Sequence, residues 1–194
     1  MKKVMALILA MVMVMALAAC GGKEAEVTPT EPAADTVEVP GSALEILENV
    51  WALYSDDEKF PVMGGDMVNM VDGAPGAYGL EDAESVTYQL LVPAEEVANI
   101  DEAASLFHGM MLNNFTCGVF RVSGDAAAFA DAMYGKISTN PWMCGMPEKM
   151  VIATIGAEYV VAMFGVNDAV NPFEAKLAEA YADADVKYSE AITG

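Results

Sequence analysis

The chain has 194 residues, of which 29 are acidic, nine are basic and one is histidine, so that its formal net charge is −20 at pH 7. Such a charge repels phosphate backbones and anionic headgroups, which disfavours nucleic-acid binding and electrostatic attachment to a membrane surface. Because 55% of the residues are hydrophobic, the chain is not a disordered acidic polymer, and we expect one domain of about 150 residues.

The first 20 residues combine two lysines, an apolar run over residues 4–19 and a cysteine, Cys20, that follows small residues. Sixteen helical residues extend about 24 Å, which is shorter than the roughly 30 Å hydrocarbon core, so a removable signal is favoured over a permanent membrane helix. The pattern resembles the signal of bacterial lipoproteins, whose cysteine is lipidated and becomes the first mature residue. It predicts a signal peptide over residues 1–19, palmitate or a similar lipid on Cys20, and a membrane-anchored protein that faces outside the cytoplasm. A secreted protein without an anchor is the alternative.

The segment that follows the cysteine is predicted to be a tether. It contains Pro29, Pro32 and Pro40, five carboxylates and no aromatic residue. Proline and like charge both extend a chain, and no apolar face is present to drive folding. We therefore predict a lipidated, disordered tether over residues 20–41 and a globular domain over residues 42–194. Cleavage of the signal would remove two lysines and make the net charge of the mature chain more negative, −22.

The globular segment begins with a helix signal. Ser42 and Glu45 have capping-box spacing and introduce apolar residues at helical intervals, which predicts a helix over residues 43–54. The glycine-rich residues 63–80 predict either a short strand or an irregular loop. Further strands are predicted over residues 85–92, 116–122, 150–155 and 158–166, and further helices over residues 101–113, 125–138 and from Asn171 onward.

Two apolar runs separated by Gly156 and Ala157 predict a hairpin with a two-residue type II′ turn. Because residues 159–164 show no polar alternation, we expect their strand to be central and covered on both faces, or packed beneath helices. This order of elements predicts an α+β fold: a single two-layer domain with a mostly antiparallel sheet and helices packed on it.

Residues 116–182 resemble an uncharacterised family of small lipoproteins from Gram-positive anaerobes. The resemblance is carried by the strand at residues 117–122, the helix after Asp125, the Pro147-Glu148 step and the hairpin containing Tyr159. Residues 142–146 depart from the family pattern. Since the family has no established activity, the resemblance implies a fold and no site residues.

The only histidine is His108, and a helix over residues 101–113 would place it on one face with Asp101 and Ser105. A working triad also requires an oxyanion site, and its members usually come from separate elements. We interpret these three residues as a solvated helix face, and we predict no catalytic or cofactor-binding residue.

Two cysteines remain besides Cys20. An extracytoplasmic location would allow Cys117 and Cys144 to form a disulfide, and the alternative is two free thiols. Met143, Met146 and Met150 lie near Cys144 and could offer soft ligands to Cu(I), but methionine more often fills gaps in a core. The acidic groups at residues 56–58 and 81–84 lack the spacing of an EF-hand loop and are interpreted as solvated turns. We therefore predict no metal and no cofactor.

The sequence favours a non-enzymatic binding or accessory module with an unidentified protein or small-molecule partner. The alternative is a carboxylate-dependent extracytoplasmic hydrolase in which Glu148 or Glu158, beside the hairpin, serves as an acid or base. Such an enzyme needs two carboxylates about 5 to 9.5 Å apart. The only arginine, Arg121, is expected to pair with a neighbouring carboxylate.

Overall fold

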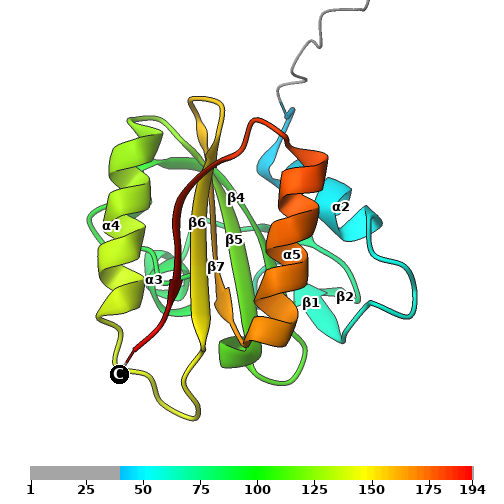
Figure 1. The fold of residues 1–194 in the computed structure, drawn as a ribbon. Coiled ribbons are helices and arrows are strands. Elements are labelled where there is room, and N and C mark those ends of the chain that lie inside the picture. Colours follow the sequence, from blue (N-terminus) through cyan, green and yellow to red (C-terminus); the bar gives the residue numbers. More distant parts are fainter. Residues whose placement is uncertain (1–39, 194) are drawn as a thin grey trace, which may run out of the picture. The chain divides into compact units, whose positions relative to one another are not determined.

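The computed structural model describes residues 40–193 (Figure 1). The predicted signal peptide, Cys20 and nearly all of the predicted tether lie outside these residues. The helices are α2 (Ala43–Ala52), α3 (Ala83–Gln89), α4 (Ala126–Ser138) and α5 (Asn167–Ala180), with short 3-10 helices η1 (Val97–Asn99) and η2 (Leu112–Asn114). The strands are β1 (Val62–Gly64), β2 (Val71–Asp72), β3 (Gly76–Tyr78), β4 (Ile100–His108), β5 (Phe115–Val122), β6 (Lys149–Ile155), β7 (Tyr159–Gly165) and β8 (Asp185–Ala191). Within residues 40–193, no helix combines the length and the hydropathy needed to span a membrane.

The strands form one antiparallel sheet in the order β2-β1-β4-β5-β7-β6-β8, and β3 pairs with β4 on the same edge as β1. The strands predicted over residues 116–122, 150–155 and 158–166 are confirmed as β5, β6 and β7. β7 lies between β5 and β6, and all of its residues are buried. The prediction of a central strand covered on both faces is therefore confirmed.

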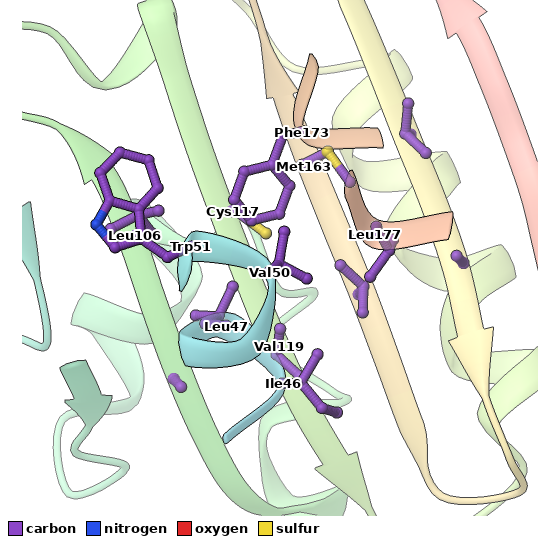
Figure 2. Close-up of a cluster of buried hydrophobic side chains, with 14 of the residues drawn as sticks. Ile46, Leu47, Val50, Trp51, Leu106, Cys117, Val119, Met163, Phe173 and Leu177 are labelled. Atoms are coloured by element: carbon purple, nitrogen blue, oxygen red, sulfur yellow. The ribbon is translucent and has the colours of Figure 1, made fainter. Parts of the chain in front are cut away.

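Helices cover both faces of the sheet (Figure 1). Figure 2 shows the core between the sheet and helices α2 and α5, which includes Ile46, Val50 and Phe173. On the opposite face, α3 and α4 pack on a second core that includes Val86 and Met133. The α+β class and the antiparallel sheet are confirmed, but the expected two layers become three, because the central strands are apolar on both sides and need cover on each.

The chain enters the domain at one end of the sheet. Tyr159 Oη donates to the carbonyl of Pro40 at 3.2 Å, and the backbone N–H of Ala43 donates to Glu102 Oε1 at 3.1 Å. Ser42 Oγ accepts from Glu45 N–H at 3.0 Å, so the predicted N-cap of α2 is confirmed. These contacts place the start of the domain beside the β6–β7 turn.

Two predicted elements exchange type. Residues 85–92 were predicted to form a strand, but most of them belong to α3, which Asp82 caps by accepting from the N–H groups of Glu84 and Ser85. Residues 101–113 were predicted to form a helix, but they begin with strand β4. β4 is buried on both faces from Ala103 to Phe107, so it lacks the alternating pattern of a half-exposed strand and its apolar residues fall at spacings that mimic a helix.

Smaller differences concern the C-terminal third. Ile155 pairs with Tyr159, so the β6–β7 turn contains three residues and not two, and Gly156 has the positive φ of 58° that favours glycine. Helix α5 begins at Asn167, four residues before the predicted start, because Glu148 Oε2 accepts from the backbone N–H of Asn167 at 2.8 Å. The tail that follows α5 forms the edge strand β8.

Candidate functional site

A cleft of about 760 Å³ opens on the α3/α4 face of the sheet. This volume lies within the range of small-molecule sites. The cleft lies between α3, the last turn of α4, the loop that follows α4 and η2. Its apolar wall includes Met67, Tyr88, Leu112, Trp142, Met143 and Phe164.

Helix α3 leaves the cleft open because it is short. The helix has seven residues and is followed by Leu91, whose positive φ of 53° turns the chain away before Pro93. Tyr88, in the last turn of α3, keeps 74% of its surface exposed. An aromatic ring that exposed, beside a cleft, offers a ligand contact area at small entropic cost.

The loop after α4 forms the opposite wall and is held in place by a single amide. Asn113 Nδ2 donates to the carbonyls of Met143 at 2.9 Å and Gly145 at 2.6 Å. The ring of Trp142 packs on that of Phe164, with 5.1 Å between centroids. The indole is therefore fixed against the end of β7, while Met143 remains 76% exposed.

Lys136 supplies the cleft with a positive charge. Residues 40–193 contain six cationic side chains, and five of them form ion pairs: Lys59 with Asp56, Arg121 with Glu102, Lys149 with Glu174, Lys176 with Glu58, and Lys187 with Asp185. The sixth is Lys136, which lines the cleft and has no ion-pair partner within the part of the chain that the structure describes. Asp82 and Glu84 line the same cleft, so both signs of charge are present.

Trp142 adds an unpaired donor. Its indole N–H is buried and has no hydrogen-bond partner among residues 40–193. Buried polar groups in proteins are nearly always hydrogen-bonded, so this N–H is an exception, although the nitrogen itself is not exposed to the cleft. Thr87 and Asn140 also line the cleft.

Asp66 holds the loop that carries Met67 into the wall. Its carboxylate accepts from the backbone N–H groups of Val68 and Asn69, each at 2.7 Å, and from that of Gly79 at 2.8 Å. Partial burial acts to raise the pKa of Asp66, but these hydrogen bonds outweigh it and lower the pKa below its ordinary value. The ionised carboxylate therefore fixes a loop whose apolar side chains are exposed.

The three residues considered for a catalytic triad all lie on strand β4. Ser105 and His108 lie three residues apart on β4, so their side chains point to opposite faces of the sheet. Ser105 is buried and donates to the carbonyl of Gly65 at 2.8 Å. His108 stacks on Phe60, with 5.9 Å between the ring centroids. The expected helix is wrong, because all three residues lie on β4; Asp101 is exposed as expected, whereas Ser105 is buried and has a structural role.

The two cysteines that were considered for a disulfide are free thiols in the structure. Cys117 is fully buried in the core beneath α2 and α5 (Figure 2), and burial raises its pKa well above its ordinary value. Cys144 is exposed on the loop after α4. A bridge would require the buried thiol to leave the core.

The candidate metal ligands are divided between core and surface. Met150 is buried beneath α4, apart from the exposed Met143 and Met146. Within residues 40–193, no three His, Cys, Asp or Glu side chains gather as a metal would require.

In the acidic group at residues 56–58, Glu58 accepts from the backbone N–H and the hydroxyl of Ser55 and pairs with Lys176. These interactions lower the pKa of Glu58 to about 2.

The carboxylates named for a hydrolase lie at opposite ends of the β6–β7 hairpin. Glu148 precedes β6 and caps α5, whereas Glu158 lies in the turn after β6. The seven residues of β6 separate them by about 23 Å at the rise of a strand. They do not form the pair that glycoside hydrolysis needs.

Arg121 Nε lies 3.7 Å from Glu102 Oε2, so the expected pairing of the arginine with a carboxylate is confirmed.

Sequence reasoning missed the cleft. Its walls come from α3, which was predicted as a strand, and from a loop 30 residues away from the asparagine that holds it. One signal was present in the sequence: a tryptophan flanked by Pro141 and Met143 within a loop is a large apolar side chain outside any predicted element. No protein-family model, curated protein or solved structure matches this chain.

Proposed function

We propose that this chain is a membrane-anchored, extracytoplasmic lipoprotein whose domain is a non-enzymatic module that binds a ligand in the α3/α4 cleft. The anchor rests on the apolar run over residues 4–19 and on Cys20. The resemblance to small lipoproteins of Gram-positive anaerobes agrees with it and stays a prediction.

The observation that carries the binding role is the cleft itself. It combines an apolar wall, to which the Trp142 ring contributes, with the ammonium of Lys136, which has no ion-pair partner among residues 40–193, and with the neutral polar side chains of Thr87 and Asn140. A large apolar pocket with a few convergent polar groups is the usual form of a ligand site. The candidate catalytic residues serve other purposes, since Ser105 bonds Gly65 and Glu148 caps α5.

The cleft suits an anchored protein because of where it lies. The chain enters the domain beside Tyr159, which is the first residue of β7. Phe164, which lines the cleft, lies next to Gly165, the last residue of β7. Figure 1 shows the start of α2 at one end of the sheet and the loop after α4 at the other. The cleft therefore lies at the end of the sheet opposite to the point where the chain enters the domain.

The anchor is tested in cells that make the natural chain or its Cys20→Ser variant. We expect the natural chain to incorporate labelled palmitate and to sediment with membranes, and the variant to do neither. Equal membrane association without label in both would contradict the lipid anchor.

The binding role is tested separately with a neutral apolar dye, Nile red, and an unlipidated chain that comprises residues 20–194 with Cys20→Ser. We expect saturable 1:1 dye binding that Trp142→Ala weakens about tenfold or more, because the indole forms the cleft wall. Leu53→Ala, which removes an exposed apolar side chain elsewhere, serves as the control. Dye binding that is equal in all three chains would contradict the cleft as the site.

A further inference from the structure

We propose that the ligand of the cleft is a short apolar peptide with a free C-terminal carboxylate, which Lys136 recognises. This inference rests on the proposed binding function and names the class of ligand for the same site. It is drawn from the charged side chains of the cleft and from its neutral polar side chains.

The carboxylate follows from Lys136. The domain has 24 acidic side chains within residues 40–193, and the other five cations in this range are paired with some of them. Lys136 is half-buried, yet it lines the cleft without a carboxylate within ion-pair distance among these residues. An ammonium left unpaired in so acidic a protein is available to an anionic group of a ligand, and a carboxylate is the anion that a lysine pairs with most simply.

A single negative charge is favoured over a polyanion. Asp82 and Glu84 line the same cleft as Lys136 and repel additional negative charge. They also attract a positive group, and a peptide with a free amino terminus carries one. A zwitterion with one charge of each sign therefore matches the cleft better than a phosphate-rich molecule does.

The peptide backbone is suggested by the neutral polar side chains. Thr87, Gln89 and Asn140 line the cleft, and Gln89 Nε2 also donates to Ser85 Oγ at 3.1 Å. Side chains of this kind donate to and accept from amide groups. The amide groups of a peptide can pair with Thr87 and Asn140, whereas the hydrocarbon tail of a fatty acid cannot.

Apolar side chains of the peptide would pack on Met67, Tyr88 and Met143. These side chains are between 72% and 76% exposed. Methionine is flexible and polarisable, so a surface rich in it adapts to apolar groups of different shapes. The site is therefore expected to tolerate variation in the side chains while it selects the carboxylate.

The test is calorimetry of the unlipidated chain with three probes: Leu-Phe-Leu with free termini, the same peptide with a C-terminal amide, and octanoate. We expect saturable 1:1 binding of the free peptide, roughly tenfold weaker binding of the amide because the charged contact is lost, and weaker binding of octanoate. Lys136→Met should bring the free peptide to the affinity of the amide. Lys59→Met makes the same change of charge away from the cleft and should keep the tenfold preference.

Equal affinity for the free peptide and its amide in the unsubstituted chain would overturn the recognition of the carboxylate by Lys136. Binding of octanoate that is tighter than that of the free peptide would overturn the inference that the ligand is a peptide. The Nile red experiment separates these results from failure of the binding function. If the dye binds in a manner that depends on Trp142 and no peptide displaces it, the peptide inference fails while the cleft function stands. If neither dye nor peptide binds, both fail.

Discussion

On the α2/α5 face of the sheet, helices of 10 and 14 residues cover a closed core, whereas on the opposite face α4 has 13 residues but α3 has only seven, and the cleft lies beside α3. The two tryptophans of the chain show the difference. Trp51 on the closed face is 7% exposed and donates its indole N–H to the carbonyl of Gly73 at 3.3 Å, while the indole N–H of Trp142 beside the cleft has no partner among residues 40–193. The proposed binding site thus lies beside the shortest helix that covers the sheet.

The largest expected contrast between the two faces is in thiol reactivity. In the unlipidated chain only Cys117 and Cys144 remain, and the first is buried while the second is exposed. We expect a water-soluble alkylating reagent to modify Cys144 at least about 10³-fold faster than Cys117, because Cys117 reacts only after the core opens. Mass spectrometry over time measures both rates. One rapid adduct is expected, and no adduct until a reductant is added would show instead that the two thiols are bridged.

The tryptophans themselves give the next contrast. Trp51→Ala should lower the free energy of unfolding by about 3–5 kcal/mol, since it opens a cavity in the closed core. Trp142→Ala should lower it by about 1–2 kcal/mol, because this side chain is only half-buried on a loop. Chemical denaturation of both variants measures the difference. An equal loss of stability would show that the cleft wall is part of the core and not a ligand site.

A smaller effect is expected for the glutamates of the β6–β7 hairpin. Glu148→Ala removes the acceptor for the N–H of Asn167 and should cost about 1 kcal/mol of stability, as loss of a helix cap does. Glu158→Ala, in the exposed turn, should change stability by less than about 0.5 kcal/mol. Thermal or chemical unfolding of the pair tests this order. The reverse order would argue against the capping role of Glu148.

The smallest effect concerns pH and the loop of Asp66. Its pKa is lower in the folded chain than the ordinary value of 3.8, so the carboxylate stabilises the loop above pH 3.8. This contribution is lost as the pH falls through the lowered pKa of the folded state. Asp66→Asn should therefore reduce the acid sensitivity of stability below pH 3.8 relative to the unsubstituted chain. Unfolding curves at several pH values measure it, and identical pH profiles would contradict the account.

Local signals of the sequence predicted much of the fold. Ser42 was placed correctly as a helix N-cap, the helix that follows Asp125 was predicted correctly, and the apolar runs of β6 and β7 were placed correctly as paired strands. The prediction of the element type failed in β4, where burial on both faces removed the usual alternation of apolar and polar residues. It also failed at Asp82, where a helix cap outweighed strand propensity. Propensity is a weak prior that tertiary packing overrides.

The cleft was beyond local reasoning for a physical reason. Asn113 fixes carbonyls 30 and 32 residues away, and Lys136 lacks an ion pair among residues 40–193 because of where the other charges of this range fold. Neither relation leaves a periodic trace in the sequence. Residue types alone placed methionine and cysteine close together in residues 143–150, but only the fold separates the buried Met150 from the exposed loop.

The central claim, that ligands bind in the cleft and not elsewhere, is tested most directly by tryptophan fluorescence in two single-tryptophan chains. Trp51→Phe leaves Trp142 as the only indole, and Trp142→Phe leaves Trp51. Upon titration with Leu-Phe-Leu, which contains no tryptophan, we predict a saturable change in emission from Trp142 and no change from Trp51. A change from Trp51 with none from Trp142 would contradict the claim.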